Sequence, residues 1–373
     1  MSVAWKSIAA EGVARAGQVG LPRWPAWPLA GALRSLLRGL VPLVLVWQTA
    51  LPSLAQSGSH AASAPGSQSD APDGGHWLAR IQGAAINRSY VGTMVVTAGG
   101  VVSSSRVTHI CDGRQRYERI DVLDGRARSQ FRHNEQLLTF WPATKVAVLE
   151  QRDPVVDFPG LPVAAGQRAA DSYDLRVVGT DRVAGHEADV LVVKPRDALR
   201  FGQRWWAERE TGLLLRADTL GARGEVLESS TFTEVSLAGK VSPETVAGPM
   251  KRLDGWRVVR APAERTQLEA EGWTLTRTVP GFHPVSCAKR PLDAATDDGA
   301  QTPVLQAVFS DGLAHVSVFI EPFEAHRHKQ PMRTSLGATN TLMSRRGDWW
   351  ITVMGEVPMS TVQQFEAALE RRK

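Results

Sequence analysis

The chain has 373 residues, of which 43% are hydrophobic and 22% are charged, a composition typical of a globular protein with room for two ordinary domains. The net charge is +5, but residues 1–55 carry five basic residues and one acidic residue, so the remainder carries only +1. A chain this close to neutrality lacks the basic surface that nucleic-acid binding requires, and nucleic acid is therefore excluded as a partner.

The first 55 residues predict a secretory signal peptide. A basic stretch that ends at Arg38 precedes an apolar run over 40–51, and Ser53 and Ala55 then form a small-x-small cleavage pattern. The apolar run is shorter than the roughly 20 residues of a membrane-spanning helix, although an uncleaved anchor remains the alternative. The true start codon is left open. Export would place the mature protein in the periplasm.

Residues 56–73 are small and polar, so they cannot bury enough apolar surface to fold, and they predict a disordered tether. A helix is predicted next, because Trp77, Ile81 and Ala84 recur at helical spacing. Asp73 is a plausible N-cap for this helix.

Residues 74–238 predict one large domain, in which the early helix ends near Asn87 and about nine antiparallel strands follow. Turns such as Gly99-Gly100 and Asp124-Gly125 separate the strands, since glycine tolerates the positive φ of a tight hairpin. An irregular, partly helical segment is expected over 153–167. This pattern predicts a strongly curved sheet or an open barrel, with the early helix packed into its open side.

Residues 239–254 contain Gly and Pro and predict a linker to a smaller domain of strands over 255–373. The chain is expected to end in a helix with Ser360 as its N-cap. Val362 and Phe365 would form the apolar stripe of that helix.

The chain has two cysteines, Cys111 and Cys287, which fall in different predicted domains. A bridge would have to span the contact between the domains, so two separate, largely buried thiols are expected. A disulfide is the alternative, because an exported protein meets an oxidising compartment.

Catalytic motifs are absent: the sequence contains no P-loop, no G-x-S-x-G, no H-E-x-x-H and no C-x-x-C. We therefore predict a binding protein without a cofactor, and an envelope hydrolase with an unrecognised acid–base pair is the alternative. His326 and His328 with Glu321 and Glu324 come closest to a metal site, but an exposed polar loop is the favoured interpretation.

Two adjacent tryptophan pairs, Trp205-Trp206 and Trp349-Trp350, fall on predicted strands. Neighbours on a strand point to opposite faces, so each pair places one ring on each side of its sheet. The ring outside the core either marks a binding surface or is covered by another part of the protein, and both interpretations stay open.

Several segments, in this order, resemble the RseB/MucB family. They include Tyr90-Val-Gly-Thr-Met-Val-Val, Trp206-Ala-Glu-Arg-Glu-Thr-Gly-Leu-Leu-Leu-Arg216, Phe309-Ser-Asp-Gly-Leu313 and Gly355-Glu-Val-Pro358. The resemblance extends over residues 75–370. It is carried by the order and spacing of these segments across both predicted domains.

The resemblance implies a mainly β (α+β) fold: a large N-terminal unclosed antiparallel β-barrel with helices, like LolA and LolB, plus a smaller C-terminal α+β domain. It implies a periplasmic negative regulator of an envelope-stress sigma factor. Such a protein binds the periplasmic region of a transmembrane anti-sigma factor, protects it from regulated proteolysis and releases it on sensing a lipid or lipopolysaccharide-type ligand.

Aromatic placement then selects candidate contact residues. For the lipid these are Phe140, Trp141, Trp205 and Trp206, and for the protein partner they are Phe319, Phe323, Trp349 and Trp350. A periplasmic lipid or lipoprotein carrier is the alternative function, although a carrier would leave the C-terminal domain unexplained. Homo-oligomer formation is left open.

Overall fold

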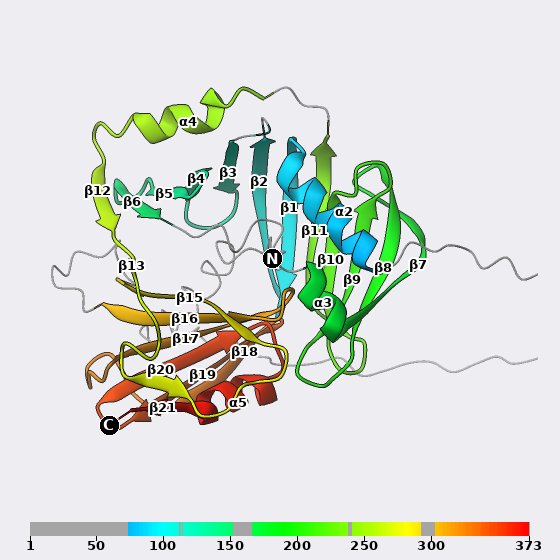
Figure 1. Ribbon diagram of the computed structural model, residues 1–373. Helices are drawn as coiled ribbons and strands as arrows, with labels where there is room; N and C mark the ends of the chain where they lie inside the picture. The colour runs from blue at the N-terminus through cyan, green and yellow to red at the C-terminus, as the bar shows by residue number, and fades with distance from the viewer. Residues whose placement is uncertain are drawn as a thin grey trace, which may run out of the picture.

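In a computed structural model of the chain, two β-rich bodies pack against each other (Figure 1). The structure describes residues 74–111, 113, 115–151, 166–237, 241–291 and 303–372. The predicted signal peptide, the tether, Asp73 and most of the segment 153–167 lie outside the described residues.

The larger body contains a 12-stranded sheet, in the order β12-β6-β5-β4-β3-β2-β1-β11-β10-β9-β8-β7. Its strands are β1 (Tyr90–Ala98), β2 (Val101–Cys111), β3 (Arg116–Val122), β4 (Ser129–His133), β5 (Gln136–Trp141), β6 (Val146–Gln151), β7 (Tyr173–Val183), β8 (His186–Pro195), β9 (Gly202–Glu208), β10 (Leu214–Leu220), β11 (Val226–Ser236) and β12 (Arg257–Ala261). Neighbouring strands run antiparallel except β12, which pairs parallel with β6. Since β7 and β12 are the two edges, the sheet is unclosed, which confirms the predicted architecture.

The sheet has an inner face and an outer face, and its register defines both. The inner face carries Ile120, Gln130 and Thr139 on one half and Ala217 and Trp205 on the other. Helix α2 (Gly74–Asn87), which confirms the predicted early helix, covers the second half of this face. Its side chains pack there with Trp205 in one buried cluster that includes Leu78 and Ile81. A short helix, α3 (Gly166–Ser172), lies beside it.

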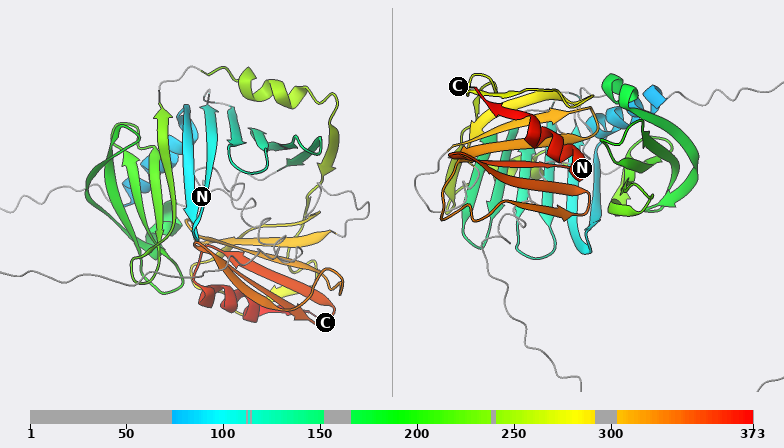
Figure 2. Two further views of the ribbon diagram at one scale, coloured as in Figure 1. Left: turned by 180° about the vertical axis from the view of Figure 1, so that it is seen from behind. Right: turned by 90° about the horizontal axis from the view of Figure 1, so that it is seen from below.

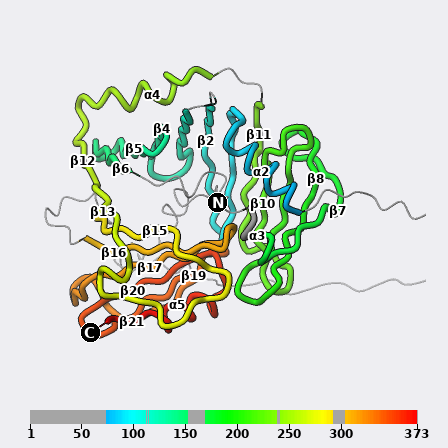
Figure 3. Tube along the Cα trace, in the orientation of Figure 1, coloured from blue at the N-terminus to red at the C-terminus, as the bar shows by residue number. Residues whose placement is uncertain are grey.

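The segment predicted as a linker contains a helix, α4 (Glu244–Lys251). Val246 is fully buried in a cluster with Phe131 and Phe140, so α4 covers the outer face of the half of the sheet that contains β4 and β5. Figure 3 shows the chain leaving β11, passing through α4 and returning as β12 before it enters the smaller body. Residues 257–261, predicted to open the second domain, therefore pair within the larger sheet.

The smaller body contains a seven-stranded sheet, in the order β13-β15-β16-β17-β20-β19-β18. Its strands are β13 (Glu264–Arg265), β15 (His283–Arg290), β16 (Val304–Ser310), β17 (His315–Pro322), β18 (Met332–Leu336), β19 (Thr339–Arg346) and β20 (Trp349–Gly355). A two-stranded sheet of β14 (Trp273–Leu275) and β21 (Leu369–Arg371) accompanies it. Strands plus one helix agree with the predicted C-terminal α+β domain.

That helix is α5 (Met359–Ala368), and it covers one face of the seven-stranded sheet. Val362 and Phe365 are fully buried there against residues such as Ile351, so the predicted apolar stripe is confirmed. The predicted cap is wrong, because Ser360 lies inside the first turn. Pro358 occupies the N-cap, and its carbonyl accepts a hydrogen bond from the N–H of Thr361.

Within the described ranges, none of the helices combines the length and apolar character required to cross a membrane. Both cysteines are free thiols, which confirms two separate thiols, one in each body. Each is half-buried rather than fully buried, because Cys111 ends β2 and Cys287 lies on β15 near the margin of the core.

Candidate functional site

The two bodies turn one sheet face toward each other. Helix α4 lies on the outer face of the large sheet and α5 lies on the far side of the small one, so both helices are on the outside of the molecule (Figures 1 and 2). We call the face of the seven-stranded sheet opposite α5 its near face. The inner face around β3–β6 and this near face therefore lie opposite each other.

The predicted lipid residues in β9 point to opposite faces, as expected, but neither ring is exposed. Trp205 is 1% exposed and lies on the inner face under α2. Trp206 lies on the outer face, where the Arg216 guanidinium sits 4.3 Å from its ring centre. Its indole N–H donates to Asp181 at 3.0 Å. The question left open by the sequence is thereby answered, because the protein itself covers both rings.

The other two predicted lipid residues are also neighbours on opposite faces. Phe140 is buried under α4, where its ring contacts Trp256 edge-on with 4.6 Å between centroids. Trp141 is half-buried on the inner face, beside Val146 and Val259. The structure therefore does not bring the four residues together. Only Trp141 and Trp205 share the inner face, and they lie in different halves of the sheet.

Three of the four predicted partner residues gather on the near face. Phe319 and Trp350 alternate away from the core residues of β17 and β20, and Phe323 lies 6.1 Å from Trp350 between ring centroids. The exception is Trp349, which packs on the α5 face, edge-on to Trp273 at 5.7 Å. A guanidinium from Arg371 stacks on Trp349 at 4.3 Å.

A histidine completes the aromatic cluster on the near face. His328 is buried and stacks on Trp350 with 4.9 Å between ring centroids. Its Nδ1 accepts a hydrogen bond from the N–H of Glu324 at 2.9 Å, and its Nε2 lies 3.4 Å from Glu321. Burial and then the charge of Arg327 lower the pKa of His328. Both effects favour the neutral form of the ring.

The same geometry separates the two histidines that came closest to a metal site. His328 is turned into the aromatic cluster, whereas the side chain of His326 is 77% exposed. Within the described residues, His, Cys, Asp and Glu side chains form no group of three that could hold a metal ion.

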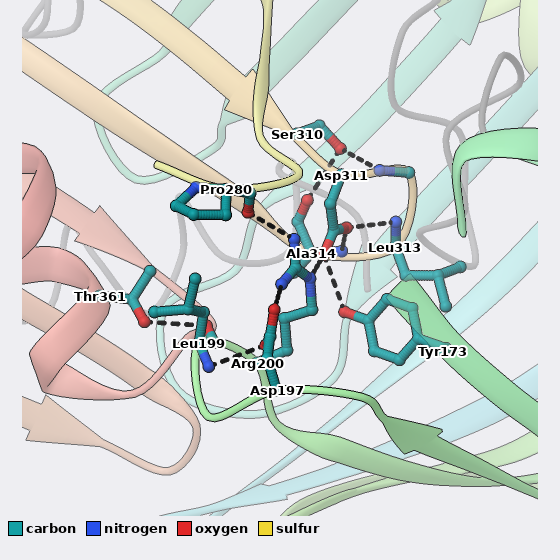
Figure 4. Close-up of polar contacts among 11 residues, drawn as sticks. Tyr173, Asp197, Leu199, Arg200, Pro280, Ser310, Asp311, Leu313, Ala314 and Thr361 are labelled. Atoms are coloured by element: carbon teal, nitrogen blue, oxygen red, sulfur yellow. Dashed lines mark hydrogen bonds and ion pairs between the residues drawn. The ribbon is translucent and has the colours of Figure 1, made fainter. Parts of the chain in front are cut away.

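The two bodies meet at a buried ion pair that the sequence analysis missed (Figure 4). Arg200, in the loop between β8 and β9, donates through Nε to Asp311, which follows β16. The side chains are 1% and 0% exposed. Tyr173 also donates its hydroxyl proton to Asp311 at 3.0 Å. The other two guanidinium nitrogens donate to Asp197 and, at 2.8 Å, to the carbonyl of Pro280.

Asp311 also fixes the conformation of its own turn. One carboxylate oxygen accepts the N–H groups of Leu313 at 2.8 Å and Ala314 at 2.7 Å, while the other accepts Arg200 and Tyr173. Ser310 donates its hydroxyl proton to the carbonyl of Ala314 at 2.8 Å. We call Ser310–Ala314 the junction turn.

The junction turn has a second, apolar anchor in the larger body. Leu313 is 6% exposed and belongs to the buried cluster formed by Trp77, Leu78 and Trp205. Nearby, the hydroxyl of Thr361 at the start of α5 donates to the carbonyl of Leu199 at 2.8 Å. Polar and apolar contacts therefore hold the same turn in the N-terminal body.

One guanidinium at this junction pairs with two carboxylates, Asp197 and Asp311. Burial by itself would lower the pKa of Arg200, but the charge of Asp311 and the hydrogen bonds to Asp197 and Asp311 outweigh it, so that pKa is raised. Burial, followed by the charge of Asp311, raises the pKa of Tyr173 well above its usual range. Tyr173 therefore stays neutral and acts as a donor, and Arg200 stays charged.

A second contact between the bodies joins two hairpin turns. Gly99, in the β1–β2 turn, and Gly337, in the β18–β19 turn, both have positive φ, +55° and +58°. A Cβ on Gly337 would come within 2.7 Å of the Cβ of Ala98, and one on Gly99 within 2.9 Å of Leu336. The turns pack so closely that only glycine fits there.

Comparisons with known proteins match both bodies. The family model of the MucB/RseB N-terminal domain matches residues 73–250, and that of the MucB/RseB C-terminal domain matches residues 267–370. The sigma factor AlgU regulatory protein MucB of Pseudomonas aeruginosa is 33% identical over 315 residues, covering 80% of this chain and 91% of that protein. The sigma-E factor regulatory protein RseB of Salmonella typhimurium is 26% identical over 302 residues, covering 81% and 92%.

Solved structures give the same match. The complex of Pseudomonas aeruginosa MucA and MucB aligns with a TM-score of 0.61 at 27% identity, over 80% of this chain and 99% of that chain. The crystal structure of MucB in complex with MucA(peri) aligns with a TM-score of 0.59 at 27% identity, over the same shares of the two chains.

Proposed function

Because this chain belongs to the MucB/RseB family, we propose that it is a periplasmic regulatory protein that binds the periplasmic region of a transmembrane anti-sigma factor. The observation that carries this proposal is the alignment of both bodies with MucB in its complex with MucA(peri). Binding would occlude the anti-sigma factor from its protease and thereby keep the stress sigma factor inactive. The protein would act by occupancy and not as an enzyme.

The geometry supports a partner that contacts both bodies. Two sheet faces turn toward each other, and the junction turn holds the bodies in one arrangement. On the near face, Phe319 and Phe323 are half-buried and Trp350, beside Phe323, is 5% exposed, and aromatic side chains are enriched among the residues that dominate binding. The chain would divide functionally near residues 239–254, into a lipid-sensing domain and a partner-binding domain.

A lipid or lipopolysaccharide-type ligand would release the partner. A ligand shifts such an equilibrium only by its differential affinity for the free and bound forms. The inner face is the proposed place for this ligand, since its apolar residues include Trp141 and Trp205. Trp205 is covered by α2, so a ligand that reached it would have to displace the helix.

The direct test is binding of the exported, mature protein to the periplasmic region of the single-span anti-sigma factor from the same organism, measured by calorimetry. Saturable binding that lipopolysaccharide competes away is expected. Failure to bind would refute the proposal, and recovery of lipid or lipoprotein alone would favour a carrier.

An adjacent pair of residues tests the proposed contact surface. Trp350→Ala should weaken partner binding by at least tenfold, since truncating an anchor typically costs about 2 kcal/mol or more. Trp349→Ala is the matched control on the opposite face of the same strand. If both variants lose partner affinity equally while their circular dichroism is unchanged, the near face is not the specific contact surface.

A further inference from the structure

The junction turn is held by an ion pair at Asp311 and by apolar packing at Leu313. This double attachment gives the turn a role beyond joining the bodies. We propose that Arg200 and Asp311 are positioning residues that fix the orientation of the two bodies and thereby set the affinity for a partner contacting both. The inference about affinity rests on the proposed function, whereas the inference about orientation stands without it.

We call the ion pair and hydrogen bonds of Arg200 the polar anchor, and these contacts depend on direction. All three guanidinium nitrogens of Arg200 have a partner, namely Asp311, Asp197 and the carbonyl of Pro280. A planar guanidinium with fixed donor directions accepts few arrangements of its partners, in contrast to apolar packing, which tolerates sliding. A buried ion pair is only weak evidence for added stability, but buried polar groups can specify one arrangement.

Gly281 shows how closely the second body fits around Arg200. Its φ is +78°, and a Cβ at this position would overlap the guanidinium of Arg200. The residue has no polar side chain, so replacing it disturbs the position of Arg200 without removing a charge. Gly281→Ala is therefore an independent way to displace the polar anchor.

The apolar anchor links the junction to the core of the larger body. Leu313, two residues beyond Asp311, packs with Trp77 and Trp205, which belong to α2 and β9. Tyr173, whose hydroxyl donates to Asp311, belongs to the same buried cluster. Displacement of α2 from the inner face would therefore disturb both anchors at once. This arrangement would transmit the state of the inner face to the orientation of the bodies.

The experiment measures the distance between the bodies and the affinity for the partner in the same variants. Spin labels are attached at Ala127→Cys and Gln330→Cys, two exposed positions in different bodies, with Cys111→Ser and Cys287→Ser removing the native thiols. Asp311→Asn, Gly281→Ala and Leu313→Ala disturb the junction. Asp174→Asn is the control, since its ion pair with Arg196 is about half exposed and lies within the larger body.

The label distance should be narrowly distributed in the wild type and in Asp174→Asn, and broadened in the three junction variants. Partner affinity should fall by about tenfold in the same three variants, equivalent to roughly 1.4 kcal/mol. A narrow, unshifted distance in folded Gly281→Ala and Leu313→Ala would overturn the proposal even if Asp311→Asn fails to fold. A broadened distance without loss of affinity would overturn the link to binding.

The two proposals fail in different ways. If the wild type does not bind the anti-sigma factor while the variants still broaden the distance, the proposed function is wrong and the positioning of the bodies stands. If the wild type binds and the distance never changes, the positioning role is wrong and the proposed function stands.

Discussion

The two tryptophan pairs share a sequence pattern but differ in what covers the ring outside the core. In β9, Trp205 is buried under α2, and Trp206 is covered by the side chains of Arg216 and Asp181. In β20, Trp349 packs toward α5, and Trp350 joins a cluster on the near face. The N-terminal pair therefore stabilises a closed part of the molecule.

The C-terminal pair is placed differently because its cluster is bordered by exposed and titratable groups. The guanidinium of Arg345, which is exposed, stacks 3.8 Å from the ring centre of Phe323. His328, which lies 3.4 Å from Glu321, contacts the rings of both Phe323 and Trp350. Trp206 and Trp350 are both 5% exposed, so neither sequence spacing nor burial distinguishes the two environments.

The largest effect should come from truncating the deepest ring. Trp205→Ala removes a side chain that is 1% exposed and leaves a cavity beneath α2, so a loss of about 3–5 kcal/mol in the free energy of unfolding is expected. Urea denaturation measures it, with Trp349→Ala as the half-buried comparison. A loss in Trp205→Ala no greater than in Trp349→Ala would mean that α2 is readily displaced.

A smaller loss of stability is expected from removing the arginine that stacks on one tryptophan of each pair. Arg216 stacks on Trp206 and also forms two hydrogen bonds with Asp218, which is 1% exposed. Arg216→Ala would leave that carboxylate buried without its cation, and about 2–3 kcal/mol of stability should be lost. Arg371→Ala removes exposed stacking contacts, at 4.3 Å on Trp349 and 5.8 Å on Trp273, for which about 0.5–1 kcal/mol is typical. Thermal unfolding of the two variants side by side tests the ranking.

Local signals predicted much of the fold. Periodicity located α2 and α5, and turn residues such as Asp124-Gly125 located the hairpins. Helix α4 falls in the segment predicted as a linker, because Gly248 and Pro249 lower helix propensity, and the burial of Val246 and its neighbours against the sheet compensates.

The junction could not be predicted because its contacts are not local. Arg200 and Asp311 are separated by 111 positions, and each looks ordinary in its own segment, one in a loop and one in an Asp-Gly turn. The parallel pairing of β12 with β6 is non-local for the same reason. Among the candidate contact residues, the alternation of faces was predictable, but the helices and side chains that cover each face were not.

The smallest effect should be a pH dependence confined to the C-terminal cluster. The pKa of His328 is lowered from 6.5, so between that value and the folded-state pKa the unfolded chain binds more protons than the folded one. The stability that the neutral ring contributes is therefore present above pH 6.5 and is lost as the pH falls below it. Glu321 and Glu324 attract the proton, whereas Arg327 and His326 oppose it, which keeps the effect small.

Protonation would also remove the Nδ1 acceptor used by the N–H of Glu324, which should loosen the segment that carries Phe323. Denaturation curves at pH 5 and pH 7.5 measure the difference in stability, and His328→Phe, which keeps the stacking on Trp350, is the control. The variant should lose part of the pH dependence while keeping most of the stability at pH 7.5. An identical pH dependence in both proteins would show that His328 does not titrate in this range.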